Sequence, residues 1–212
     1  MRMKVTVNKE CAMLSHQDLK ELVVQLLVKV GVPSNDAAVV ADCMVRADLR
    51  GVESHGVRWL DIYLKRIMAG CVKPVTKLTT VREKAGFLLL DAHSGLGQVA
   101  LRKGMEMGIS KAKTAGICVV AVRNSNHCGA LAYYSEMAAK ANMAAMVMTN
   151  STPLMAPWGG VTPSIGTKPI SFGFPTNGDP VILDMATSAS ARGKVFVAAQ
   201  KGMQLPDGVA PN

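Results

Sequence analysis

The chain has 212 residues, which is enough to bury a sizeable hydrophobic core. Hydrophobic residues make up 49% and charged residues 18%, a globular composition that argues against an intrinsically disordered protein. Aromatic residues make up only 4%, which argues against a binder of single-stranded nucleic acid that stacks bases on rings. No apolar stretch reaches the ~18 residues that a transmembrane helix needs.

The formal net charge is +9, from 24 Lys and Arg against 15 Asp and Glu. An excess of positive charge favours anionic partners. The basic residues are dispersed, however, without a dense Lys/Arg tract. We therefore expect a solvated basic surface or a phosphate-bearing small molecule, and no nucleic acid.

The chain has five cysteines and no C-x-x-C pair, which favours free thiols in a reducing cytoplasm over a disulfide framework. No histidine pair has the spacing of metal ligands, so we expect no metal site. The first twelve residues lack the apolar core and cleavage site of a signal peptide. These features predict a cytoplasmic protein.

Residues 1–73 predict an N-terminal helical segment. Ser15 is placed to cap a helix that ends at Gly31, and apolar residues recur at helical spacing between them. A second helix is predicted to start at Pro33 and end near Gly51. A third is predicted to start around 54–57 and to close at Gly70.

Residues 74–212 predict a mixed α/β domain that we expect to be incomplete at its C-terminal end. Strand and helix patterns alternate, as they do in α/β folds. Two apolar runs, 117–122 and 144–148, predict strands buried on both faces. Residues 151–179 are rich in Pro, Gly, Ser and Thr and predict a long loop. The other predicted strands are 78–81, 87–90 and 181–184, and the predicted helices are 97–114, 129–141 and 186–200.

The segment from Gly95 to Ala100 matches the G-x-G-x-x-A pattern of a dinucleotide-binding turn. Four residues separate it from the preceding strand, which is long for that tight turn. The next strand ends in Arg123 and Asn124, without an acidic residue for a ribose. We therefore favour a helix start built of small residues over a Rossmann cofactor loop.

Two histidines lie where a loop meets a predicted helix. His55 follows Glu53 and Ser54 and precedes a glycine, and His127 follows a predicted strand in the segment Asn124–Gly129. The carboxyl end of a strand in an α/β sheet is where ligands usually bind. A lone histidine is more often structural, but two in such settings are candidates for a site.

A set of segments, in order along the chain, carries a resemblance to a known family. They are Ser54-His55-Gly56, Arg123-Asn124-Ser125-Asn126-His127, Thr149-Asn150-Ser151, Pro157-Trp158-Gly159-Gly160, Gly166-Thr167-Lys168-Pro169 and Leu183-Asp184-Met185-Ala186-Thr187-Ser188. Together they resemble the malate/L-lactate dehydrogenase family of the second type, which includes ureidoglycolate and sulfolactate dehydrogenases and diketogulonate reductase. The resemblance runs from about Ser15 to Pro206.

The resemblance implies a non-Rossmann α/β fold and a homodimer or larger assembly. It implies hydride transfer between NAD or NADP and a small 2-hydroxy or 2-oxo acid such as malate or lactate. It also implies that His55 or His127 donates and accepts the proton, a role for which a group that titrates near neutral pH is suited. The remaining roles are substrate binding by Ser54, Arg58 and Ser151, and cofactor binding by Asp184, Met185 and Ala186.

The chain departs from the family pattern at three points. Family members usually carry arginine four residues after the first histidine, where this chain has Trp59 and places Arg58 one position earlier, a rotation of ~100° on a helix. Lys168 replaces an asparagine, either to contact a phosphate or to face water. The family chain also continues beyond this one with a further glycine-rich segment. Two alternatives follow, a truncated and catalytically inactive relative and a basic anion-binding module.

Overall fold

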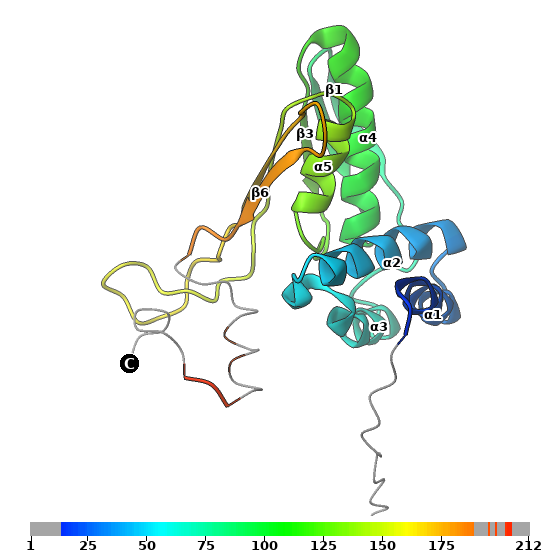
Figure 1. The fold of residues 1–212 in the computed structure, drawn as a ribbon, viewed down its shortest axis with the longest axis vertical. Helices are drawn as coiled ribbons and strands as arrows, with labels where there is room; N and C mark the ends of the chain where they lie inside the picture. The colour runs from blue at the N-terminus through cyan, green and yellow to red at the C-terminus, as the bar shows by residue number, and fades with distance from the viewer. Residues whose placement is uncertain (1–13, 189–194, 196–197, 199–201, 205–212) are drawn as a thin grey trace, which may run out of the picture.

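The computed structural model describes residues 14–188, 195, 198 and 202–204. Figure 1 shows helices α1, α2 and α3 gathered at one end of the long helix α4, with α5 and the strands alongside it. Within these residues, even α4, with 19 residues, lacks the apolar length of a membrane span.

The helical segment contains α1 (His16–Lys29), α2 (Ser34–Leu49) and α3 (Leu60–Met68). The predicted cap of α1 is confirmed, because the Ser15 hydroxyl accepts a hydrogen bond from the backbone N–H of Asp18 at 3.1 Å. The buried apolar faces of the three helices form one core with the start of α4. This core contains residues on both sides of the predicted domain boundary at 73/74, so that boundary stays a prediction.

The third helix starts later than predicted. Two short 3-10 turns, η1 (Glu53–His55) and η2 (Val57–Trp59), precede α3. Gly56 separates them in an extended conformation and packs against the side chain of Asp48. The Asp48 carboxylate accepts the backbone N–H of Val57 at 2.8 Å, a local bond that competes with a continuous helix.

The first sheet of the described region has the order β1 (Thr79–Lys84), β2 (Phe87–Asp91) and β3 (Val119–Arg123). β1 and β2 are antiparallel, whereas β2 and β3 are parallel and joined through α4 (Gly97–Ala115). The side chains of β2 and β3 that face α4 pack around its glycines, where no Cβ keeps the helix away from the sheet.

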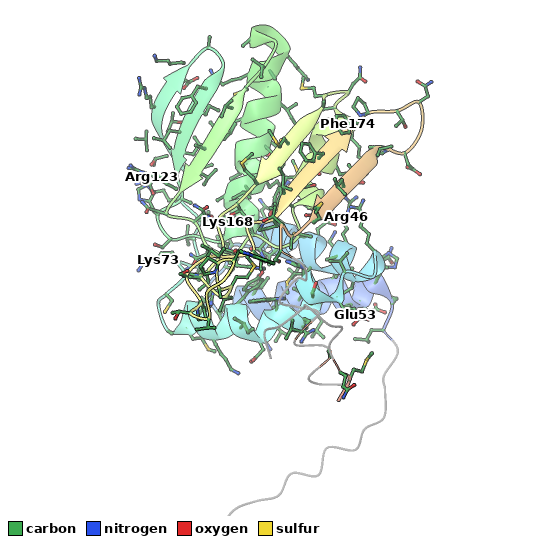
Figure 2. The ribbon with its side chains drawn as sticks, turned by 90° about the vertical axis from the view of Figure 1, so that its left-hand side faces the viewer. Arg46, Glu53, Lys73, Arg123, Lys168 and Phe174 are labelled. Atoms are coloured by element: carbon green, nitrogen blue, oxygen red, sulfur yellow. The ribbon has the colours of Figure 1, made fainter. Side chains whose placement is uncertain are left out.

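The second sheet is antiparallel and contains β4 (Ala145–Met148), β5 (Ile170–Phe174) and β6 (Val181–Met185). It packs on α5 (Ala132–Lys140), which starts three residues later than the predicted helix at 129. Figure 2 shows the two sheets on either side of α4. A doubly wound sheet would be parallel throughout, so the mixture of directions confirms the non-Rossmann α/β class.

Strand β5 was missed by the sequence analysis, which assigns residues 151–179 to a loop. The face of β5 toward α5 is built of small residues, so no apolar run marks it. Ser171 is fully buried and shares a hydrogen bond of 2.7 Å with the Ser135 hydroxyl, and Gly173 packs on the Ser135 backbone. The predicted helix 186–200 lies mostly outside the described residues.

The prediction that the runs 117–122 and 144–148 are buried on both faces is wrong. Val119 in β3 is 56% exposed, and Met146 and Met148 in β4 are 56% and 61% exposed. Val147, which points the other way, is buried in the core next to α5. Helices α4 and α5 thus cover one face of the sheets, and in the described part of the chain the opposite face stays apolar and open.

The two glycines of the G-x-G-x-x-A segment serve packing. A Cβ on Gly97 would overlap the backbone carbonyls of Asn126 and His127, and a Cβ on Gly95 would meet Thr76 at 2.7 Å. The first turn of α4 is therefore pressed against the loop that carries His127. This arrangement supports a helix start built of small residues.

We predict that Gly97→Ala destabilises the chain by about 1–3 kcal/mol, the usual cost of inserting a methyl group into a packed site. The matched control is Gly104→Ala in the same helix, where the added Cβ would find neighbours at an ordinary 3.5 Å. That variant should be more stable than the wild type by about 0.5–1 kcal/mol, because alanine favours a helix over glycine. Urea unfolding measures both, and equal effects would contradict the packing role of Gly97.

Candidate active site

All eight predicted site residues line one cavity of about 2600 Å³, called here the central cavity. It lies among α2, the 3-10 turns, α4, β3, β4 and the end of β6. The predicted residues on its wall are Ser54, His55, Arg58, His127, Ser151, Asp184, Met185 and Ala186. Residues as far apart in the chain as Ser54 and Ala186 therefore share one space.

The loop that carries His127 is fixed at several points. Asn124 adopts a positive φ of 51° and donates its side-chain N–H to Asp91 at 2.8 Å. Asn126 donates to the backbone carbonyls of Ser94 and Gly95 at 2.9 and 3.0 Å. These bonds tie the segment after β3 to the end of β2 and to the turn before α4, so the backbone that leads into His127 is held in place.

Four side chains form what we call the ring cluster, made of His55, Trp59, Tyr63 and His127. The Tyr63 hydroxyl lies 2.6 Å from Nδ1 of His127. The indole of Trp59 stacks on the His127 imidazole, with centroids 4.4 Å apart and planes inclined by 13°. His55 is also nearly parallel to His127, at 5.8 Å and 16°.

The hydrogen bonds at Nδ1 assign the tautomer of His127. The backbone N–H of Gly129 points at Nδ1 from 3.4 Å and can only donate. Burial raises the pKa of Tyr63 well above its ordinary value, so its hydroxyl keeps its proton and also donates to Nδ1. Nδ1 is then the acceptor, and neutral His127 carries its proton on Nε2.

His127 is neutral at physiological pH. Burial, reinforced by the neighbouring His55 and Arg66, lowers the pKa of His127 to about 4. The cause is physical, because an imidazolium there would lose hydration and face another positive charge. The ring is therefore suited to donate a hydrogen bond from Nε2 at neutral pH.

His55 differs from His127 in having a carboxylate nearby. Its Nδ1 lies 3.0 Å from the Ser54 hydroxyl. Burial lowers the pKa of His55, while the charge of Asp184 opposes the shift. The pKa of Asp184 is itself raised by partial burial, although its carboxylate accepts the backbone N–H of Ala132 at 2.7 Å, at the start of α5. Asp184 therefore caps α5 and also favours a protonated His55.

Ser151 and Arg58 lie on other parts of the cavity wall. The Ser151 hydroxyl accepts the backbone N–H of Lys168 at 3.1 Å and lies 3.4 Å from the Thr167 hydroxyl, closing the base of the loop between β4 and β5. Lys168 lies where that loop meets β5 (Figure 2). Arg58 is exposed, one position before Trp59 of the ring cluster.

The sequence analysis did not assign Trp59, Tyr63 and Arg66 to the site. The structure brings the first two into contact with His127, and the charge of Arg66 acts on it. Trp59, Tyr63 and Arg66 follow one another at intervals of four and three, which places them along one side of the stretch that η2 and α3 form. That spacing is the signal by which the sequence could have revealed them.

The sequence of this chain matches the malate/L-lactate dehydrogenase family over residues 14–212. The chain belongs to the malate/L-lactate dehydrogenase family. The resemblance stated from the motifs is thereby confirmed.

Members of this family with curated names are similar over most of the chain. Malate dehydrogenase of Pyrococcus abyssi is 45% identical, over 97% of this chain and 57% of that protein. Ureidoglycolate dehydrogenase (NAD(+)) of Escherichia coli is 34% identical, over 92% and 56%. The (2R)-3-sulfolactate dehydrogenase (NADP(+)) of Chromohalobacter salexigens is 37% identical, over 93% and 60%.

The solved structures agree with these matches. The structure of malate dehydrogenase from Pyrococcus horikoshii OT3 superposes with a TM-score of 0.85, at 45% identity, over 92% of this chain and 56% of that one. The chain thus spans between 56% and 60% of the length of these malate/L-lactate dehydrogenase relatives.

We predict that the stability of the chain falls as the pH drops from about 6.5 to about 4. Folding lowers the pKa of His127 from 6.5 to about 4, so the unfolded chain takes up the proton first. The stabilisation is complete above pH 6.5 and decreases by up to about 3 kcal/mol as the pH approaches 4. Urea unfolding at several pH values measures this slope.

His127→Asn should flatten the slope, and His16→Asn, at an exposed position, should leave it unchanged. His55 also makes the stability fall with decreasing pH, because its pKa is lowered in the folded chain. His55→Asn should therefore flatten the part of the slope that His127→Asn leaves. A slope that is the same in the wild type and in His127→Asn would contradict the assignment of a buried neutral imidazole.

Proposed function

We propose that this protein is a nicotinamide-dependent oxidoreductase that transfers a hydride between NAD or NADP and a small 2-hydroxy or 2-oxo acid, such as malate or lactate. The observation that carries the proposal is the convergence of both candidate histidines and all six predicted binding residues on one cavity. The family membership and the names of the relatives support the same reaction class.

The central cavity fits a dinucleotide cofactor. Its volume of about 2600 Å³ exceeds the ~300–1,000 Å³ of ordinary small-ligand pockets, which leaves space for cofactor and substrate together. Met185 is 48% exposed on the cavity wall, and its polarisable thioether suits the flat face of a nicotinamide. Ala186 adds a small surface beside it. We propose NAD or NADP, because relatives named for each cofactor are similar to this chain.

Reduction of a 2-oxo acid requires a hydride at the carbonyl carbon and a proton at the carbonyl oxygen. The bound nicotinamide supplies the hydride. We assign the proton to a protonated His55, because Asp184 favours the positive charge there. Neutral His127 donates a hydrogen bond from Nε2 to the same oxygen and stabilises the negative charge that develops on it. In the reverse direction, His55 takes the hydroxyl proton.

The substrate carboxylate requires a positive partner, and a guanidinium fork matches its two oxygens. Arg58 and Arg66 both line the central cavity, and Ser54 lies beside His55 on the same wall. We propose that these residues bind the polar groups of the substrate and that Ser151 contributes from the base of the loop. A homodimer remains part of the proposal, and the apolar sheet face that the described residues leave open supports it. A location in the cytoplasm remains part of the proposal as well.

One alternative has a specific observation in its favour. The chain spans 56–60% of the length of its relatives, and a cofactor site built from several segments is sensitive to loss of one. A truncated, inactive relative is therefore the second candidate. The basic anion-binding module is disfavoured, because Arg46 in α2 and Arg50 at its C-cap are engaged with Asp42 and Glu136.

We predict saturable binding of NADH or NADPH when either is titrated calorimetrically into the purified chain. Met185→Asp should weaken the affinity at least ~10-fold, a change of about 1.4 kcal/mol, by placing a carboxylate against the cofactor. Met68→Asp is the matched control, because Met68 is 68% exposed and lies outside the cavity wall. No binding by a chain that still unfolds cooperatively would favour the inactive relative.

We also predict that His55→Ala and His127→Ala each lower turnover of a 2-oxo acid at least ~100-fold in a protein extended to the length of its relatives, the low end for general acid–base catalysis. The assay follows NADH or NADPH oxidation with a panel of 2-oxo acids. Wild-type turnover in both variants would show that the histidine roles assigned here are wrong.

A further inference from the structure

The ring cluster contains a side chain to which the proposed reaction gives no role. Trp59 is half-buried, and its indole lies flat against the His127 imidazole at 4.4 Å and 13°. Its other ring neighbour is Tyr63, at 6.0 Å and 31°. Trp59 therefore contacts both partners of the Tyr63–His127 hydrogen bond, and it lines the central cavity itself.

The indole is anchored at its polar end. Trp59 Nε1–H donates to the backbone carbonyl of Ser54 at 2.6 Å, which fixes the ring relative to the turn η1 that carries His55. A tryptophan ring has only two side-chain torsions, and a bond at its edge together with packing on its face leaves it little freedom. The anchored indole thus acts as a rigid plate beside His127.

The orientation of His127 depends on more than its hydrogen bond to Tyr63. The bonds from Tyr63 and Gly129 both meet the imidazole at Nδ1, so they fix one atom but allow the ring to tilt and to turn about its last torsion, which is broad for histidine. A plate stacked at 4.4 Å restricts that tilt, because rotation of the ring would bring its edge into the indole. The Tyr63 bond sets the position of Nδ1, and Trp59 sets the plane.

We propose that Trp59 is a positioning residue, which holds the His127 imidazole in one plane with Nδ1 toward Tyr63 and Nε2 free for a substrate oxygen. The role of Nε2 in this statement rests on the proposed function. The geometry of the ring does not, so it can be tested without cofactor or substrate.

The test is nitrogen NMR of the full chain labelled with 15N-histidine, which reports the tautomer and the pKa of each imidazole. His127 is assigned by the loss of its signal in His127→Asn. In the wild type we expect one neutral tautomer, with the proton on Nε2 and a midpoint near the pKa of about 4. In Trp59→Leu we expect a mixture of tautomers and a midpoint that moves up toward 6.5, because the ring gains freedom and contact with water.

Two further variants separate positioning from general packing. Trp59→Phe keeps an aromatic plate but lacks the N–H that bonds Ser54, so it should retain most of the Nε2 tautomer with a smaller shift of the midpoint. If the backbone amide spectrum shows that Trp59→Leu does not fold, Trp59→Phe alone tests the proposal. Trp158→Leu is the matched control, because Trp158 is fully exposed, at 104%, and should leave the His127 signal unchanged.

A His127 tautomer and midpoint that are the same in the wild type, Trp59→Phe and Trp59→Leu would overturn the proposal. So would an equal change in Trp158→Leu. If the chain fails to bind NADH or NADPH while the His127 signals respond as expected, the proposed function fails and the positioning role of Trp59 stands.

Discussion

The hydrogen bond between Tyr63 and His127 is the interaction on which the candidate site depends. It joins residues 64 positions apart and links helix α3 to the loop that follows β3. Because the imidazole is largely removed from water, loss of this partner would leave Nδ1 with only the longer contact to Gly129. The same bond orients the imidazole, so one contact serves both the stability of the fold and the position of the candidate catalytic ring.

Close packing at two glycines supports that contact. Gly97 lets the first turn of α4 lie on the carbonyls of Asn126 and His127, and Gly56 lets the turn that carries His55 lie on Asp48. His55 and His127 are then both partly buried on the wall of the central cavity. The arrangement costs stability at low pH, because the imidazolium is hydrated in the unfolded chain and not in the folded one.

The two sheets are each covered by a helix on one face. On the opposite face, Met146, Phe174, Val181 and Leu183 are between 48% and 60% exposed. Sheets of α/β proteins are stable when both faces are covered. The apolar face that the described residues leave open is therefore a surface that a further layer can cover.

The sequence by itself determined the order of most helices and strands, the family, and the residues that meet at the central cavity. Capping residues, helical spacing and apolar runs are local signals. An ordered set of motifs can likewise be recognised in the sequence without knowing which residues are in contact. The tertiary structure decided which runs are buried, and that β5 pairs between β4 and β6 although its inner face is Ser171 and Gly173. It also decided that Trp59 stacks on His127. Burial and ring contacts depend on which neighbours the whole chain brings together, and no local pattern carries that information.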